Sequence, residues 1–275
     1  MTDRSTSVAQ VEIATRIARS LGGRQGLGAP VRRSFARSRD GAGAPSPVAE
    51  VISSGKTRGG PGGTTRLRLL LSVMWKAGAK APYSVSGTPA WWARLIGIDD
   101  PDVEGARSVR NALRDLQNRG LLRPTRPGTA ATQSVTPLLE DGSGTAYTPP
   151  ERDYFRVPEV FWTQGIITRL QAPALVMLLC VLSVSQWDER TQQFHVVQFR
   201  PTTTKQVFGV SDSTRKRGLK ELSDQGLLED LTGPDVGYSV DGMPRNRSRH
   251  YRLTPLFRPP ARPKSQEQAE QANAM

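Results

Sequence analysis

Two apolar segments, each long enough for a buried helix, stand at equivalent places in the two halves of the chain. Arg66–Ala77 carries charge only near its two ends, and Ala172–Ser183 is apolar at almost every position. Apolar runs of about 10–12 residues favour a helix over a strand. We therefore expect each half to begin with one buried helix.

A leucine pattern repeats downstream of each apolar segment. Ser108–Leu122 and Thr214–Leu228 align without gaps, and each carries two leucines three residues apart, which share one face of a helix. A glycine follows, as is typical of a left-handed residue that ends a helix, and two further leucines begin a buried strand. The pattern predicts helix, stop and strand in both halves. The identical positions are Leu113/Leu219, Leu116/Leu222, Gly120/Gly226, Leu121/Leu227 and Leu122/Leu228.

A short helix is expected between the apolar helix and the leucine-rich helix of each half. In the first half Thr88 is expected as the N-cap, with Pro89 at the first helical position. In the second half Thr203 is expected as the N-cap and forms a capping-box pattern with Gln206. The first half also carries additional residues, Asp99–Gly105, ahead of its third helix.

This order of elements resembles that of winged helix-turn-helix proteins, over about residues 65–147 and 154–257. In the second half, Phe208–Leu228 is similar to the turn and recognition helix of GntR-like and MarR-like regulators. The resemblance implies a mainly α fold with small β-wings. It also implies two tandem winged helix-turn-helix domains, at residues 65–150 and 151–257.

The segments outside these two domains have compositions that do not build a core. Residues 1–64 are rich in Gly, Ser, Arg and Pro, and we expect a disordered basic arm there. Within that arm, apolar spacing over residues 8–21 predicts one short helix that folds on a partner. Residues 258–275 begin with Arg and Pro and end in Gln, Glu and Ala, so a flexible tail is expected.

The charge balance indicates the kind of partner. The chain has 38 Lys and Arg against 25 Asp and Glu, which gives a formal charge of +13 and a pI near 10.6. Such an excess favours a polyanion, and nucleic acid is the first candidate. A solubilising basic surface is the alternative that composition alone leaves open.

Few residues are suited to metal, redox or catalytic chemistry. Cys180 is the single cysteine, and His195 and His250 are the two histidines, so neither an intrachain disulfide nor a zinc cluster is expected. No phosphate-binding Gly loop and no nucleophile with a His partner is recognisable. We expect a non-enzymatic protein without metal or cofactor. No stretch is apolar enough for a membrane span or signal peptide, which favours a cytoplasmic, nucleoid-associated protein.

The resemblance implies that each third helix enters the major groove with its N-terminal half. In the second unit Arg215 and Arg217 are expected to read bases, since Arg binds guanine through two hydrogen bonds, and in the first unit Asn111 suits adenine. A solvated charged helix face is the alternative. The basic wing of the second unit is expected to grip phosphates or a minor groove. The expected DNA-binding residues are Arg107, Ser108, Arg110, Asn111 and Arg114 in the first unit, Ser213, Thr214, Arg215, Lys216 and Arg217 in the second, and Arg245, Arg247 and Arg249 in its wing.

The sequence therefore predicts a sequence-specific double-stranded DNA-binding protein, with regulation of transcription as the leading role. One alternative is a replication initiator of a plasmid or phage that binds repeated origin sites. Another is a tandem winged-helix module that joins proteins in a chromosome-organising complex. A homodimer stays an open alternative, since two units in one chain can replace the usual dimer.

Overall fold

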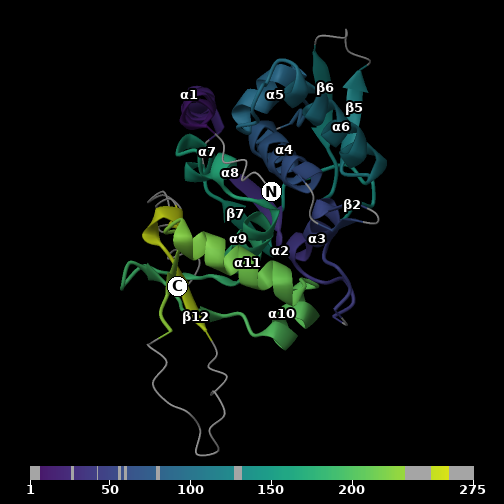
Figure 1. The fold of residues 1–275 in the computed structure, drawn as a ribbon. Helices are drawn as coiled ribbons and strands as arrows, with labels where there is room; N and C mark the ends of the chain where they lie inside the picture. The colour runs from purple at the N-terminus through teal and green to yellow at the C-terminus, as the bar shows by residue number, and fades with distance from the viewer. Residues whose placement is uncertain are drawn as a thin grey trace, which may run out of the picture.

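The computed structural model describes residues 7–25, 28–41, 43–54, 57–58, 61–78, 81–126, 132–232 and 249–259. In these residues the chain is mainly helical with small antiparallel sheets (Figure 1). This agrees with the expected mainly α class. Among the described residues, no helix is both long and apolar enough to cross a bilayer. Arg245 and Arg247 of the expected wing and the expected tail beyond residue 259 lie outside the described residues.

Two segments repeat one order of elements, helix, strand, helix, helix, strand, strand, and we call them the first and second units. The three strands of each unit form one antiparallel sheet in which the last strand lies in the centre: β4-β6-β5 in the first and β10-β12-β11 in the second. The first unit comprises α4 (Pro61–Ala77), β4 (Val85–Gly87), α5 (Pro89–Leu95), α6 (Glu104–Asn118), β5 (Leu122–Arg126) and β6 (Gln133–Pro137). The second comprises α9 (Ala172–Val184), β10 (Val197–Gln198), α10 (Pro201–Phe208), α11 (Asp212–Asp224), β11 (Leu228–Asp230) and β12 (His250–Leu253).

The repeated leucines and glycines act as the sequence predicts. Leu113 and Leu116 in α6 are buried, as are their equivalents in α11. Gly120 and Gly226 both have positive φ, +66° and +67°, and end the two helices. Just past each glycine, a leucine N–H donates back to the carbonyl of the second leucine of the stripe, at 3.0 Å in the first unit and 2.9 Å in the second. This is the hydrogen bond expected of a left-handed helix end.

The two short second helices begin differently from one another. Thr88 caps α5 as predicted, because its hydroxyl oxygen accepts a hydrogen bond from the Trp91 N–H at 3.0 Å. The predicted cap at Thr203 is wrong, because α10 already begins at Pro201 and Arg200 is its N-cap residue. Proline is favoured in the first turn of a helix, so Pro201 sets the start.

The N-terminal segment corrects the prediction of a disordered arm over residues 1–64. The predicted short helix is present as α1 and reaches further than residue 21. The described chain after α1 also folds against the two units, and Phe35, Val48 and Val51 are almost fully buried. These apolar residues are few and scattered, so they become a core only through contacts with distant parts of the chain. The elements are α1 (Val8–Gln25), β1 (Ala29–Arg32), α2 (Arg33–Ala36), α3 (Pro47–Ile52), β2 (Ser53–Ser54) and β3 (Thr57–Arg58).

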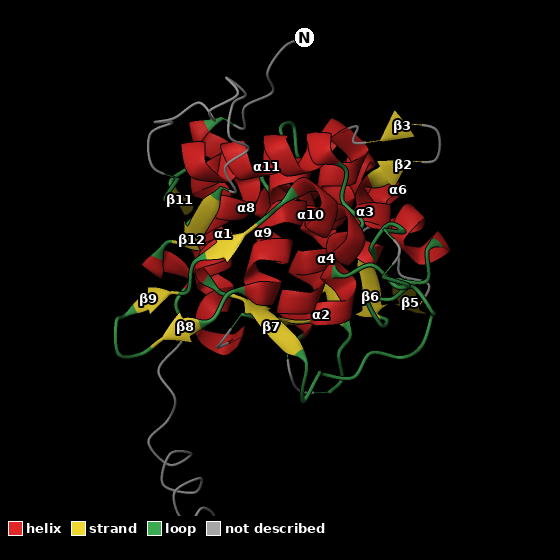
Figure 2. Ribbon diagram, turned by 90° about the horizontal axis from the view of Figure 1, so that it is seen from below, coloured by secondary structure: helices red, strands yellow, loops and turns green. Residues whose placement is uncertain are grey.

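The remaining elements join the units or follow them. β1 pairs antiparallel with β7, so backbone hydrogen bonds join the N-terminal segment to the start of the second half. Figure 2 shows β7 at the edge of the molecule opposite α11. A small hairpin of β8 and β9 is inserted between α9 and β10. The bounds are β7 (Tyr154–Val157), α7 (Val160–Thr163), α8 (Ile166–Arg169), β8 (Trp187–Asp188), β9 (Gln193–Phe194) and a final 3₁₀ turn, η1 (Pro255–Phe257).

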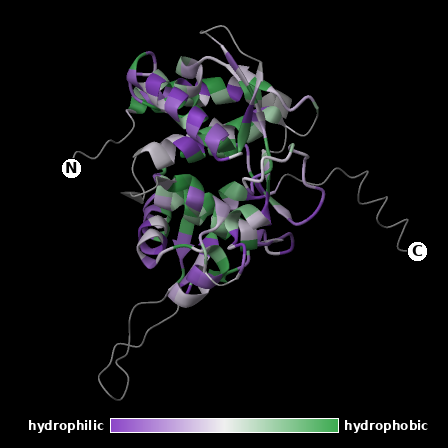
Figure 3. Ribbon diagram, turned by 90° about the vertical axis from the view of Figure 1, so that its right-hand side faces the viewer, coloured by the Kyte–Doolittle hydropathy of each residue, from purple (hydrophilic) through white to green (hydrophobic). Residues whose placement is uncertain are grey.

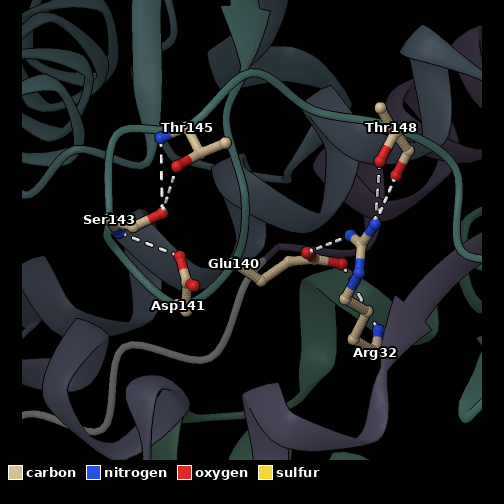
Figure 4. A network of polar contacts seen from close by, with 6 residues as sticks. All are labelled: Arg32, Glu140, Asp141, Ser143, Thr145 and Thr148. Atoms are coloured by element: carbon tan, nitrogen blue, oxygen red, sulfur yellow. Dashed lines mark hydrogen bonds and ion pairs between the residues drawn. The ribbon is translucent and has the colours of Figure 1, made fainter.

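The loop after β6 is held against β1 by a partly buried ion pair between Glu140 and Arg32 (Figure 4). Arg32 Nη1 lies 2.7 Å from the Glu140 carboxylate, whose side chain is only 2% exposed. Arg32 also donates to the carbonyl of Thr148 at 2.6 Å. β6 ends at Pro137, and the loop that carries Glu140 turns back onto the protein, with a bridge between Leu138 and Ala146. Glu140 therefore holds the N-terminal segment in place.

One continuous hydrophobic core runs through both units. Figure 3 shows hydrophobic positions on the inner sides of the helices and hydrophilic positions on the outer sides. At the junction, the rings of Trp75 and Trp162 stack with centroids 4.6 Å apart, and the Trp162 ring N–H donates to the Ser72 hydroxyl. Such stacking adds about 0.5–1.5 kcal/mol beyond the apolar area that the rings bury.

Arg68 is the buried charge at this junction. It projects from α4, is 5% exposed, and donates to the carbonyl oxygens of Ile96, Thr168 and Leu170 at 3.1, 2.8 and 3.0 Å. Ile96 belongs to the first unit, and the other two residues lie directly before α9. Burial lowers the pKa of Arg68 to about 10, so the guanidinium stays charged at neutral pH. It replaces water as the donor for three carbonyls at once.

Arg68→Met is expected to destabilise the whole chain by about 3 kcal/mol or more, because buried carbonyls without a donor cost about 1–3 kcal/mol each. Denaturant unfolding followed by tryptophan fluorescence and by circular dichroism measures this. The two signals should shift together, since the units share one core. An unchanged unfolding midpoint would contradict the role given to Arg68.

Candidate nucleic-acid interface

The solvent side of α6 is a strip of cationic and amide side chains. The opposite side of α6 packs into the core through Val109, Leu113 and Leu116, which are at most 2% exposed. This leaves the predicted residues of the first unit on the outer surface, and all of them are exposed. They are Arg107, Ser108, Arg110, Asn111 and Arg114.

Most of the charge on the α6 strip is not neutralised within the described residues. Arg107 lies 3.9 Å from Glu104, and both side chains are about 70% exposed, so the pair is weak. Arg114 donates to the Asn111 amide oxygen at 3.1 Å. Arg110 has no carboxylate partner among the described residues. Guanidinium donors are thus available to an external acceptor.

In α11 the N-cap is Ser211, whose hydroxyl accepts from the Thr214 N–H at 3.3 Å. Thr214 is half-buried, whereas Ser213, Lys216 and Arg217 are exposed. Lys216 pairs with Asp212 at 2.9 Å. Arg217 donates only to the backbone carbonyl of Ser213, at 3.3 Å, within the described residues. Arg217 is therefore the cation of α11 with most capacity left for a partner.

Arg215 corrects the prediction that it reads bases. Its side chain is buried, 9% exposed, and donates to the Phe199 carbonyl at 3.0 Å and to Asp212 at 2.7 and 3.0 Å. In the aligned repeats Arg215 is equivalent to Val109, which lies in the core of the first unit. Arg215 therefore anchors the first turn of α11. Its hydrogen bonds, followed by those of Lys216, hold the pKa of Asp212 below the usual value.

Lys220 was not among the predicted residues, yet it extends the cationic strip of α11 by one turn. It is the equivalent of Arg114 in the first unit, and its side chain is 75% exposed. A salt bridge of 2.7 Å to Asp224 accounts for its present position. The aligned repeats contain the signal for Lys220, since both third helices carry a cation there.

Arg249 lies directly before β12, at the base of the expected wing of the second unit. Its guanidinium lies 3.6 Å from Asp230 across the β11–β12 pair, and its side chain is 66% exposed. Arg249 thus lies beside α11, and Arg249, Lys216 and Lys220 line one hollow of about 560 Å³. The wing tip itself lies outside the described residues.

Two arginines from the first unit fix α6 to the N-terminal segment. Arg66 donates to the Val51 and Ser53 carbonyls at 2.8 and 3.2 Å and to Asp115 of α6 at 2.8 Å. Arg119 donates to the Glu50 and Ser53 carbonyls at 2.9 and 2.8 Å. α3 ends at Ile52, beside these two arginines. Cations at a helix C-terminus donate hydrogen bonds to its free carbonyls and interact favourably with the helix dipole. Burial, and then the charge of Arg119, lowers the pKa of Arg66.

The helices α6 and α11 lie on one side of the molecule. α6 and α11 both face the viewer in Figure 1 and lie in the upper half of Figure 2. The helices are held by the buried junction described above, so their spacing is set by the core.

Within the described residues, no group of three or more His, Cys, Asp or Glu side chains is placed to hold a metal ion. Cys180 lies fully inside the core, and burial raises the pKa of its thiol. No protein-family model, curated protein or solved structure matches the chain. The function is therefore inferred from the chemistry of its own surface.

Arg215→Ala is expected to lower the free energy of unfolding by about 2 kcal/mol, because it removes hydrogen bonds of a charged donor and leaves the Phe199 carbonyl buried. Arg217→Ala, two residues on and exposed, is the matched control and should change it by less than about 0.5 kcal/mol. Chemical denaturation measures both. Equal stability of the two variants would remove the anchoring role.

Proposed function

We propose that the chain is a sequence-specific double-stranded DNA-binding protein built from two tandem winged helix-turn-helix domains. The observation that carries the proposal is the repeat itself. Two units with the same element order and the same sheet order each expose a cationic third helix. A fold with a third helix in front of a three-stranded wing is one that places this helix in the major groove.

The division of the third helices into two faces supports this. The inner faces carry the leucines that pack in the core, and the outer faces carry Arg, Lys, Asn and Ser. These polar side chains are the ones that bind phosphates and base edges. The net charge of +13 adds a long-range attraction for a polyanion. Two exposed cationic strips, one on each third helix, favour a polyanionic partner over a surface that is charged for solubility alone.

The roles follow from exposure. Arg110 and Arg217 are exposed on the outer faces of α6 and α11, and neither has a carboxylate partner in the described chain, so we assign base contacts to them. Lys216 and Lys220 are already paired with aspartates on their own helix. Release of those pairs on binding lets the lysines serve as point charges for phosphates. Regulation of transcription is the role proposed for the complex.

Arg217→Ala is expected to weaken binding to a duplex selected by the wild-type protein by about 1–3 kcal/mol, or roughly 5- to 150-fold, while binding to random duplex changes less. Arg110→Ala should do the same for a different part of the selected sequence. Fluorescence anisotropy with labelled duplexes measures both affinities.

Arg190→Ala is the charge-matched control, because Arg190 is exposed in the turn of the β8–β9 hairpin, which Figure 2 places on the side opposite α11. It should leave the sequence preference unchanged. Equal losses on selected and random duplexes for Arg110→Ala and Arg217→Ala would refute their assignment as base-reading residues.

A further inference from the structure

A hollow of about 340 Å³ opens between the first turn of α4 and the outer face of α6. It is lined by Gly62 and Arg66 from α4 and by Ser108, Asn111 and Arg114 from α6. Asp115 is the acidic residue of the lining, and it is bound to Arg66 at 2.8 Å. The lining thus combines two guanidinium groups, the hydroxyls of Thr65 and Ser108 and one amide with a single neutralised carboxylate.

The donors of this hollow have capacity for an anion. Arg114 donates from one nitrogen to the Asn111 amide oxygen. Its other N–H groups and the Asn111 amide N–H₂ are available as donors. The first turn of α4 adds backbone N–H groups without acceptors inside the helix, and the positive end of its dipole. Arg66 is 5% exposed and is paired with Asp115, so the unpaired positive charge of the hollow comes from Arg114.

The second unit offers an internal comparison at the equivalent place. There Gly218 replaces Ala112 and α9 approaches α11 so closely that a Cβ on Gly218 would lie 2.4 Å from the Pro173 carbonyl oxygen. Glu221, the equivalent of Asp115, accepts a hydrogen bond from the Gln171 backbone N–H at 2.7 Å. In the second unit, therefore, an anionic group of the chain itself binds at the start of the first helix, whereas in the first unit Asp115 turns to Arg66.

We propose that the hollow is a phosphate-binding site, occupied by a backbone phosphate of the duplex when α6 lies in the major groove. The proposal rests on the proposed function and changes its details. It makes Ser108, Asn111 and Arg114 a phosphate clamp that sets the register of α6. Base reading by the first unit is then assigned to Arg110, which lies further round the helix, and to Arg107, which lies about two turns before Arg114 on the same face.

Gly62 provides a test that separates binding from folding. A Cβ at Gly62 meets only the Arg66 guanidinium, at 3.4 Å, so a side chain fits. Gly62→Asp places a carboxylate in the first turn of α4, where it favours the helix, but also in the path of a phosphate. We expect an unfolding temperature equal to or above that of wild type, together with weaker DNA binding. Gly62→Asn, which is nearly isosteric and neutral, should bind like wild type.

The affinities of wild type, Gly62→Asp, Gly62→Asn, Arg114→Gln and Arg107→Gln are measured against salt, on a selected and on a scrambled duplex. For Arg114→Gln we expect equal fold losses on both duplexes and a slope of log affinity against log salt reduced by about 0.9. For Arg107→Gln the loss should be larger on the selected duplex. A larger loss on the selected duplex for Arg114→Gln, or wild-type binding by Gly62→Asp, would overturn the clamp.

Failure of the proposed function gives a different result, namely no duplex binding by the wild type. Inorganic phosphate is then the probe, compared with chloride at equal ionic strength by thermal unfolding. A phosphate-dependent rise in unfolding temperature that is lost in Arg114→Gln would assign the hollow to a free phosphate compound. No rise in the wild type would eliminate the site.

Discussion

The buried guanidinium of Arg68 is the constraint on which the arrangement of the two units depends. It gives three carbonyls from two parts of the chain one shared donor, at the point where α4 meets the segment before α9. Moving these segments apart would leave buried carbonyls and a buried guanidinium without partners, which is costly, so the segments around Arg68 have little freedom. The stacked rings of Trp75 and Trp162 add apolar contact beside it. The spacing of α6 and α11 follows from this junction.

Surface charge is organised differently on the two third helices. On α11 the lysines are paired with aspartates of the same helix, and Arg217 stands out as the cation without such a pair in the described chain. On α6 the guanidinium groups are less neutralised, and Arg114 borders a hollow with further donors. The dense basic run of the second unit predicts base reading by Arg215 and Arg217. The geometry gives the first unit at least an equal share of the available positive charge.

Repeated, local patterns were predictable from the sequence, and long-range contacts were not. The leucine and glycine positions of α6 and α11 follow from helix periodicity and from the positive φ of Gly120 and Gly226, so the C-terminal ends of both helices could be found. The folded part of the N-terminal segment after α1 could not be predicted, because Phe35 and Val48 gain their burial from distant partners. The prediction that Arg215 reads bases is wrong, because it rests on the basic run Arg215–Arg217 and not on the position of Arg215 in the helix. Its alignment with the buried Val109 shows that this position of the helix faces inward.

The most direct test of DNA recognition is to incubate the purified full chain with sheared DNA from its source at moderate salt and to sequence the fragments that stay bound. Two recognition helices held at a fixed spacing should enrich fragments that share a two-part sequence, located at promoters for a regulator and in clustered repeats for an initiator. A bound pool with the same sequence content as the input would contradict sequence-specific binding and favour a module that joins proteins.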